Sequence, residues 1–197
     1  MKARESGMPE EGMWVTFFTP KEVLHKLGLA TSGDVVDFGC GYGTFTIPAA
    51  QITSGTIHAL DIDPAMAAIT REKADAAGLG NVRTCVRDFM ADGIGLPDAS
   101  VNYVMLFNIL HAECIYALLQ EAFRILAAGG KLGIIHWNYD PTTPRGPAMA
   151  IRPRAEQCRE WAEAAGFSLL PPGIIALPPH HYGMVLERPG SSRWPTT

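Results

Sequence analysis

The chain has 197 residues, of which 47% are hydrophobic, enough apolar material for a domain with its own core. Its formal net charge is −4 at pH 7, and no stripe of lysine and arginine is available to contact phosphates, so we expect no nucleic-acid partner. No apolar run approaches the ~18 residues that a membrane helix requires, so we expect no membrane partner.

The four cysteines are scattered at positions 40, 85, 114 and 158, with no Cys-x-x-Cys pair. This usage is typical of reduced thiols inside a cytoplasmic protein. The opening residues lead into no apolar run of signal-peptide length. We therefore expect a cytoplasmic location.

Residues 1–32 are expected to form an N-terminal segment with one short helix. Thr19-Pro20-Lys21-Glu22 has the pattern of a capping box with proline at the first helical position, which predicts a helix from Pro20 to about Leu27. Earlier in the segment, Trp14, Phe17 and Phe18 could close over a ligand as a lid. Plain packing against the core is an equally good interpretation of these three rings.

From Gly33 onward, predicted strands alternate with predicted helices. The strands are expected near 34–38, 56–60, 82–86, 101–107 and 131–137, and the helices over about 44–51, 64–77, 113–127 and 154–165. This alternation predicts an α/β, doubly wound and mostly parallel sheet with helices on both faces. Apolar segments on both sides of Pro178-Pro179-His180 predict a final hairpin, so the last strand should run antiparallel. We place this domain at 33–188 and a disordered tail at 189–197.

Two helix boundaries have local signals. Asp63-Pro64 is typical of an N-cap followed by the first helical residue. Gly129-Gly130 is expected to end the helix over 113–127.

A glycine-rich turn follows the first strand of the domain, in the run Asp37-Phe38-Gly39-Cys40-Gly41-Tyr42-Gly43. A dinucleotide fingerprint requires another glycine where this chain has Thr44, and a P-loop requires a lysine that is absent from 39–48. The turn therefore lacks the usual means of holding a pyrophosphate. Asp61 ends the second strand about twenty residues later, where a carboxylate accepts hydrogen bonds from ribose hydroxyls.

This run resembles the first motif of class I S-adenosylmethionine-dependent methyltransferases, Asp-x-Gly-x-Gly-x-Gly, and the resemblance extends over about 33–137. It implies a small, single-domain, type 11-like member with a seven-stranded Rossmann-like sheet. It also implies S-adenosylmethionine as cofactor and methyl donor, with S-adenosylhomocysteine as product. The cofactor-binding residues carried over by the resemblance are Asp37, Gly39, Gly41, Gly43, Asp61, Ile62, Asp88, Phe89 and Asn108.

Each of these residues has an expected role by resemblance. Asp37 and the glycines would hold the methionine end, Asp61 the ribose, and Ile62 the adenine face. Asp88 would accept from the adenine amino group, with the Phe89 amide near the ring, while the chain at Asn108 would pass between methionine and substrate.

The sulfonium methyl is already activated, so its transfer by in-line displacement requires alignment more than covalent help. A base is needed only when the nucleophile arrives protonated. His111 directly follows the fourth strand and is our catalytic candidate, although a helix-start histidine bonded to backbone is the alternative. His136 lies in an apolar strand and is better interpreted as a buried histidine. We expect no metal site, since the aspartate and asparagine pattern of magnesium-dependent relatives is absent.

The sequence thus predicts a methyltransferase with a small-molecule acceptor, as a monomer or homodimer. Another S-adenosylmethionine-using enzyme on the same fold, or a non-catalytic cofactor-binding subunit, stays open as an alternative. Arg145 and Arg152, in the long loop 138–153, could hold an anionic substrate or could equally be solvated surface charges.

Overall fold

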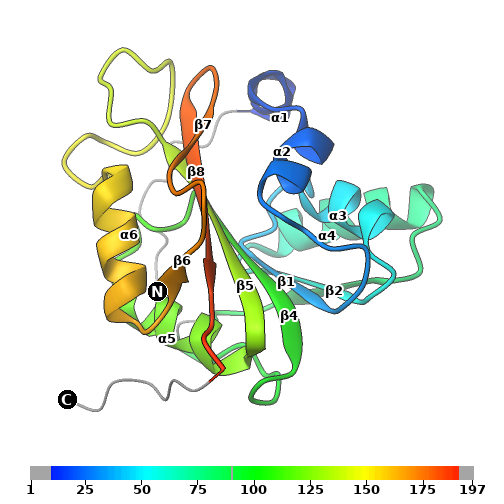
Figure 1. The fold of residues 1–197 in the computed structure, drawn as a ribbon. Coiled ribbons are helices and arrows are strands. Elements are labelled where there is room, and N and C mark those ends of the chain that lie inside the picture. The colour runs from blue at the N-terminus through cyan, green and yellow to red at the C-terminus, as the bar shows by residue number, and fades with distance from the viewer. Residues whose placement is uncertain (1–9, 90, 191–197) are drawn as a thin grey trace.

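The computed structural model describes residues 10–89 and 91–190, which form a central sheet with helices on both faces (Figure 1). The strands are β1 Val35–Phe38, β2 Ile57–Asp61, β3 Val82–Val86, β4 Val101–Phe107, β5 Leu126–Trp137, β6 Ser168–Leu169, β7 Ile175–Leu177 and β8 His181–Glu187. The α-helices are α1 Glu11–Trp14, α2 Pro20–Lys26, α3 Thr46–Ile52, α4 Pro64–Ala76, α5 Ile115–Ile125 and α6 Ala155–Ala164, and a 3₁₀ turn, η1, spans Val15–Phe17.

The strand order is β3-β2-β1-β4-β5-β8-β6, with β1 to β5 parallel and β8 antiparallel to β5. The short strands β6 and β7 pair with opposite ends of β8, so together they occupy the seventh position of the sheet. The predicted seven-stranded, doubly wound fold with an antiparallel last strand is confirmed. The order reverses between β1 and β4, which opens a crevice at the carboxyl ends of these strands.

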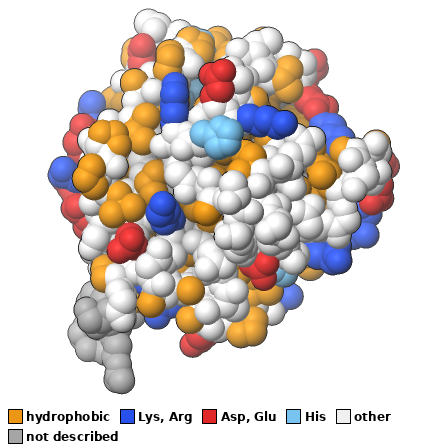
Figure 2. All heavy atoms as spheres, turned by 45° about the vertical axis from the view of Figure 1, so that its right-hand side comes forward, with side chains coloured by type: hydrophobic (Ala, Val, Ile, Leu, Met, Phe, Trp, Pro, Cys, Tyr) orange, Lys and Arg blue, Asp and Glu red, His pale blue; other side chains and the backbone are white. Residues whose placement is uncertain are grey.

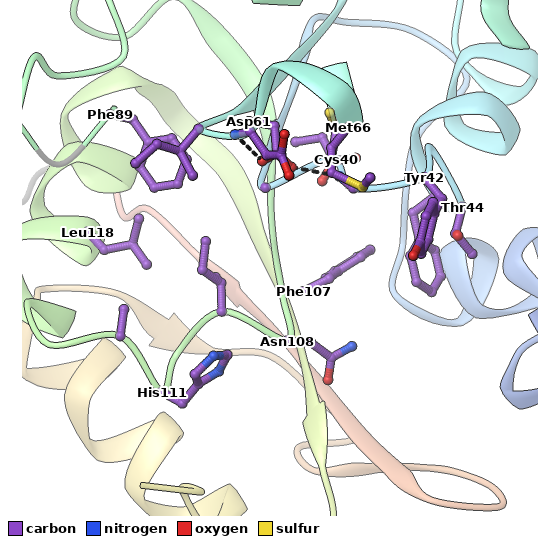
Figure 3. A pocket seen from close by; sticks show the side chains of 18 of the residues that line it. Cys40, Tyr42, Thr44, Asp61, Met66, Phe89, Phe107, Asn108, His111 and Leu118 are labelled. Atoms are coloured by element: carbon purple, nitrogen blue, oxygen red, sulfur yellow. Dashed lines mark hydrogen bonds between the residues drawn. The ribbon is translucent and has the colours of Figure 1, made fainter. Parts of the chain in front are cut away.

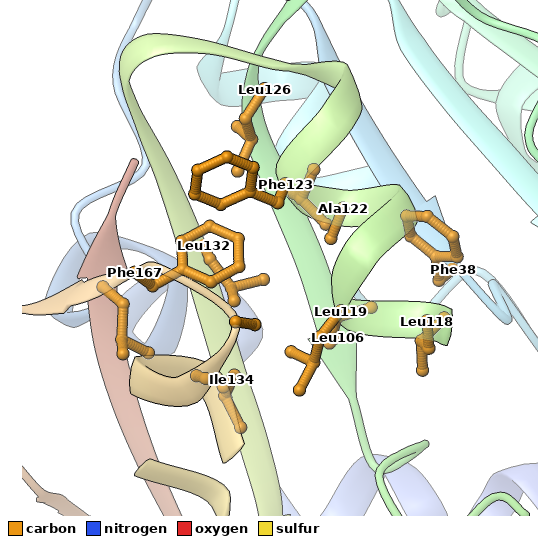
Figure 4. Packing of buried hydrophobic residues seen from close by; sticks show 14 of the residues in the cluster. Phe38, Leu106, Leu118, Leu119, Ala122, Phe123, Leu126, Leu132, Ile134 and Phe167 are labelled. Carbon is orange, nitrogen blue, oxygen red and sulfur yellow. The ribbon is translucent and has the colours of Figure 1, made fainter. Parts of the chain in front are cut away.

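The parallel strands β1, β2 and β4 are largely buried on both faces, so they supply side chains to two cores. The edge strand β3 is largely exposed. In β4, Val104 and Leu106 face one core, whereas Met105 and Phe107 face the other. Figure 1 shows α5 and α6 on the first side of the sheet and α1 to α4 on the second. Figure 4 shows the first core, where the Phe123 ring meets the Phe167 ring edge-on, with centroids 5.2 Å apart.

Two helix starts were predicted from capping patterns, and only one has the expected hydrogen bond. The Asp63 side chain accepts from the Ala65 amide at 2.8 Å and caps α4, as predicted. The Thr19 side chain makes no capping hydrogen bond, so the predicted capping box at α2 is wrong, although Pro20 does begin that helix.

The predicted end of the helix over 113–127 was also wrong. Helix α5 ends at Ile125, and β5 begins at once with Leu126. Leu126 pairs with Val101 and Lys131 pairs with Tyr103, so the residues between them form a bulge in β5. Gly129, with φ +74°, serves this bulge rather than a helix terminus.

The described residues can be compared with the predictions on membrane and nucleic-acid partners and on the chain termini. No helix in the part of the chain that the structure describes is both long and apolar enough to cross a membrane. On the face shown in Figure 2, basic and acidic side chains are interspersed, with no continuous basic surface. The predicted tail at 189–197 lies outside the described residues except for its first two, as do residues 1–9 of the predicted N-terminal segment.

His181 lies inside an aromatic cluster rather than at the surface. Its ring is 1% exposed and contacts the rings of Phe18 and Trp137, with centroids 4.4 and 4.2 Å away. Neither ring nitrogen has a hydrogen-bond partner. Burial, with His180 and Arg152 nearby, lowers the pKa of His181 to about 3, so the folded protein holds this histidine neutral.

This buried histidine predicts acid sensitivity. A folded-state pKa below the ordinary value of 6.5 means that its neutral form stabilises the fold above pH 6.5, and that this stability is lost as the pH falls toward about 3. A single such group contributes a slope of about 1.4 kcal/mol per pH unit. Denaturant titrations between pH 6.5 and 4 should show that His181→Phe reduces the slope by about this amount.

The control is His25→Phe, because His25 is exposed on α2. This variant should keep the acid slope of the original chain. An unchanged slope in His181→Phe would contradict the burial argument.

Candidate functional site

A pocket of about 300 Å³ lies at the carboxyl ends of β1, β2 and β4, where the strand order reverses (Figure 3). Of the ten site residues expected from the sequence, nine line it: Asp37, Gly39, Gly41, Asp61, Ile62, Asp88, Phe89, Asn108 and His111. The tenth, Gly43, faces away from the pocket, because a side chain there would meet the Thr70 hydroxyl of α4 at 3.1 Å.

The glycine turn runs directly beneath this pocket. Gly39 has φ +75°, and its amide donates to the Leu60 carbonyl of the neighbouring strand at 2.8 Å. A β-carbon at Gly39 would meet Ile109 at 3.3 Å across the pocket. A glycine here therefore permits the turn and keeps the pocket open.

Asp61 is oriented by two backbone amides at the end of β2. Its Oδ2 accepts from the Gly41 amide and its Oδ1 from the Asp63 amide, both at 2.9 Å. The carboxylate is 8% exposed and lines the pocket. Each oxygen has a second lone pair, so Asp61 can accept two further hydrogen bonds from a ligand.

Asp37, in β1, is more deeply buried. The Thr46 hydroxyl of α3 donates to its Oδ2 at 2.5 Å. Burial, with a contribution from the charge of Asp61, raises the pKa of Asp37 to about 7, although the Thr46 hydrogen bond acts in the opposite direction. Asp37 therefore changes charge near neutral pH.

One side of the pocket lies at the ends of β2 and β3. Ile62 is 38% exposed and lies with Met66 on this side. Phe89 packs edge-on against Phe38 of β1, with ring centroids 5.1 Å apart. Asp88 accepts from the Ala91 amide at 3.1 Å, which orders the turn that carries both residues.

Two side chains of the pocket lining have buried polar atoms without a hydrogen-bond partner. Asn108 has φ +56°, and both polar atoms of its side chain are buried without a hydrogen-bond partner. The Thr44 hydroxyl is in the same condition, and both residues line the pocket. Buried polar atoms are rarely left unpaired, so a polar ligand is expected to satisfy them.

His111 lies across the pocket from Asp61, on the same side as Asn108 (Figure 3). Its Nδ1 is 3.4 Å from Nε2 of His136, which is completely buried in β5. Burial and the neighbouring His111 lower the pKa of His136 well below its usual value. His136 is therefore neutral, and its Nε2 can accept a hydrogen bond from Nδ1 of His111; in that tautomer, Nε2 of His111 carries no proton and can act as an acceptor.

The strand ends do not bring every polar residue to the pocket. His181 lies in the aromatic cluster. Tyr139 lines a separate hollow with Arg154, whose guanidinium is 3.8 Å from the Tyr139 ring centroid.

No group of three metal-ligating side chains occurs within residues 10–89 and 91–190. Several lining residues were not predicted from the sequence, because their apolar or loop character matches ordinary core residues; among them are Tyr42, Phe45, Met66, Ala112 and Leu118.

Of the N-terminal aromatics, Trp14 lines the pocket, whereas Phe17 and Phe18 pack into the second core. Lys73 of α4 pairs with Glu11 and donates to the Tyr42 carbonyl at 2.8 Å. Helix α1 is thereby joined to the glycine turn.

Comparisons with known proteins agree with this geometry. A family model described as a methyltransferase domain matches residues 35–130. The chain is 30% identical, over 65% of its length, to aklanonic acid methyltransferase DauC of Streptomyces sp. (strain C5). It is 29% identical, over 62% of its length, to a sterol 24-C-methyltransferase of Yarrowia lipolytica. It spans 60% of the first relative and 33% of the second.

Solved structures share the fold. A SAM-dependent methyltransferase from Aquifex aeolicus superposes with a TM-score of 0.81 at 22% identity, covering 91% of this chain and 94% of that one. The [4+2]-cyclase SpnF superposes with a TM-score of 0.74 at 18% identity, covering 86% and 79%. Residues 35–130 thus form a methyltransferase domain of the class I S-adenosylmethionine-dependent, type 11-like kind.

The titration of Asp37 predicts pH-dependent cofactor affinity. With its pKa raised to about 7, Asp37 is protonated below neutral pH and ionised above it. An ionised carboxylate binds the ammonium group of the methionine end more strongly, so affinity should rise about tenfold from pH 6 to pH 8. Calorimetry with S-adenosylhomocysteine at several pH values measures this rise.

Two variants test the assignment to Asp37. Asp37→Asn should remove this rise in affinity. Any effect of the ligand's own titration on affinity would be the same in both proteins, so the difference between them reports on Asp37. Thr46→Val should move the rise to higher pH, because the Thr46 hydrogen bond lowers the pKa of Asp37. The same pH profile in all three proteins would contradict this role for Asp37.

Proposed function

We propose that this protein transfers a methyl group from S-adenosylmethionine to a small-molecule acceptor. The main support for this proposal is the position of Asp61. Its carboxylate is oriented into the pocket by the Gly41 amide and faces His111 across the pocket. The pocket thus has an acidic, glycine-lined side suited to a nucleoside and a second side that carries a base.

The residues present fit S-adenosylmethionine. Asp61 would hold the ribose hydroxyls and Ile62 the adenine face, while Asp37 and the amides of the glycine turn would hold the methionine end. The unpartnered amide of Asn108 supplies a donor and an acceptor beside them. When bound, the cofactor supplies an electrophilic methyl group on a positively charged sulfur.

The chain's own contribution to the reaction is alignment and proton transfer. The pocket orients the acceptor and excludes water, because most of its lining is apolar. His111 removes the acceptor proton with Nε2, while His136 accepts a hydrogen bond from Nδ1 and holds the ring in this tautomer. His136 is therefore a positioning residue.

Calorimetry tests the cofactor assignment. S-adenosylmethionine and S-adenosylhomocysteine should bind, and NAD should not, since Thr44 replaces the glycine that a dinucleotide fingerprint requires. Asp61→Ala should weaken the binding of both by at least about tenfold, because hydrogen bonds to a charged acceptor are lost. Unchanged affinity would refute the ribose assignment.

Asp63→Ala is the matched control, since Asp63 is the neighbouring carboxylate and caps α4. It should lower stability by about 1 kcal/mol and change cofactor affinity by no more than about twofold. Cofactor binding without S-adenosylhomocysteine release on any acceptor would favour the non-catalytic alternative.

Kinetics test the histidine pair. His111→Gln should lower kcat about 100-fold, as expected for loss of a general base, and leave cofactor affinity unchanged. It should also abolish the acidic limb of the pH–rate profile. His136→Phe should lower kcat by a smaller factor and shift that limb, because His111 remains but its tautomer is no longer held. A His111→Gln enzyme with the original profile would exclude this base.

A further inference from the structure

We infer that the acceptor is a neutral, planar and largely apolar molecule that presents a weakly acidic hydroxyl, a phenol or an enol, to His111. This inference rests on the proposed function and adds the chemical class of the acceptor. Four features of the described residues carry it: where the charges of the pocket lie, what its second side is made of, where the nearby arginines are engaged, and what the reaction does to the net charge.

The charges of the pocket are confined to one side. All four carboxylates that line it belong to the ends of β1, β2 and β3: Asp37, Asp61, Asp63 and Asp88. No lysine or arginine is among the described residues that line it. The side above β4 and β5 therefore offers an ionised acceptor no counter-charge.

That second side is a wall of rings and aliphatic groups. Phe107 ends β4 and Trp137 ends β5, and Trp14 lies against Trp137 with ring centroids 6.0 Å apart. Ile109, Ala112 and Leu118 add aliphatic groups to this lining. Rings held at these angles offer faces and edges to a planar molecule.

Apart from the indole N–H groups, the polar side chains that the described residues place in this wall are the amide of Asn108 and the imidazole of His111. They lie close together in the segment that follows β4, and Figure 3 shows both on the same side of the pocket. This pair can bind one small polar substituent. A hydroxyl fits it, since a hydroxyl donates to His111 and accepts from the Asn108 amide.

The loop 138–153 also supplies arginines that could act as a counter-charge for an ionised acceptor, so their contacts matter. Arg152 is buried, and its guanidinium donates to four backbone carbonyls of the same loop and to the Thr143 hydroxyl. Its donors are used within the loop, so Arg152 fits neither of the two interpretations from the sequence, an anion-binding residue or a solvated surface charge. Arg154 is stacked on Tyr139 in the separate hollow.

The charge balance of the methyl transfer also favours a neutral acceptor. In the transfer, the acceptor oxygen bonds to the methyl carbon, the sulfur–methyl bond breaks with its electron pair left on sulfur, and the hydroxyl proton passes to His111. One positive charge is lost at sulfur and one appears on the imidazole, so the charge of the pocket does not change. A carboxylate or an ammonium acceptor would instead have to enter the apolar side already ionised, which is costly without a partner.

Three probes with one ring system test the inference at pH 7: 2-naphthol, 2-naphthoate and 2-(aminomethyl)naphthalene, which are neutral, anionic and cationic. Binding of each to the full-length protein saturated with S-adenosylhomocysteine is measured by fluorescence. We expect 2-naphthol to bind at least about tenfold more tightly than the other two, because burying an unpaired charge is unfavourable. With S-adenosylmethionine, 2-naphthol should also support the fastest release of S-adenosylhomocysteine.

A charge placed on the apolar side should weaken this preference. Ala112 is half-buried next to His111 and lines the pocket. Ala112→Lys should shift the ratio of naphthoate to naphthol affinity toward naphthoate by about tenfold, through a charge-assisted hydrogen bond. Ala112→Met, of similar length and without charge, should not shift the ratio.

Several results would overturn the inference: equal or tighter binding of naphthoate or the amine to the original protein, no binding of 2-naphthol, or no shift in Ala112→Lys. Calorimetry with S-adenosylmethionine separates this outcome from failure of the proposed function. Cofactor binding with a preference for an ionised probe refutes only the acceptor class, whereas no cofactor binding refutes the methyltransferase proposal itself.

Discussion

The hydrogen bond from the Gly41 amide to the Asp61 carboxylate joins the ends of two neighbouring strands, and the pocket depends on it. It holds the glycine turn after β1 against the end of β2, at the place where the strand order reverses. The same turn is held from below by the Gly39 amide and from α4 by the Thr70 hydroxyl, which donates to the Gly41 carbonyl at 2.9 Å. The carboxylate that would bind the ribose is thus also the one that shapes the turn.

This double use explains why the acidic side of the pocket could be found from the sequence. A short buried strand, a glycine turn and an acid at the next strand end are local patterns, and parallel pairing brings them together without further information. The bulge in β5 could not be found in this way. Gly129 and Gly130 follow a good helix, and only pairing of β5 with β4 and β8 makes the chain extended from Leu126 onward. Tertiary pairing outweighed a local helix-stop signal.

The second side of the pocket was less predictable for a related reason. Trp14, Phe107 and Trp137 come from three distant parts of the chain, and each alone is indistinguishable from a core aromatic. His136 shows the same difficulty, since its burial in an apolar strand was expected, whereas its contact with His111 depends on how β5 lies beside the segment after β4. Side chains that meet only through long-range packing carry no signature in the sequence.

The two sides of the pocket differ in which charges they can hold. On the acidic side, burial raises the pKa of Asp37 and the charge of Asp61 adds to this shift; a cationic ligand relieves the repulsion between the two carboxylates. On the apolar side, His136 stays neutral because burial and His111 oppose its protonation, so the histidine pair carries no more than one positive charge. An acidic side that attracts a sulfonium and an apolar side that can hold one proton are complementary, because a transfer that moves positive charge from the first to the second needs no counter-ion from outside.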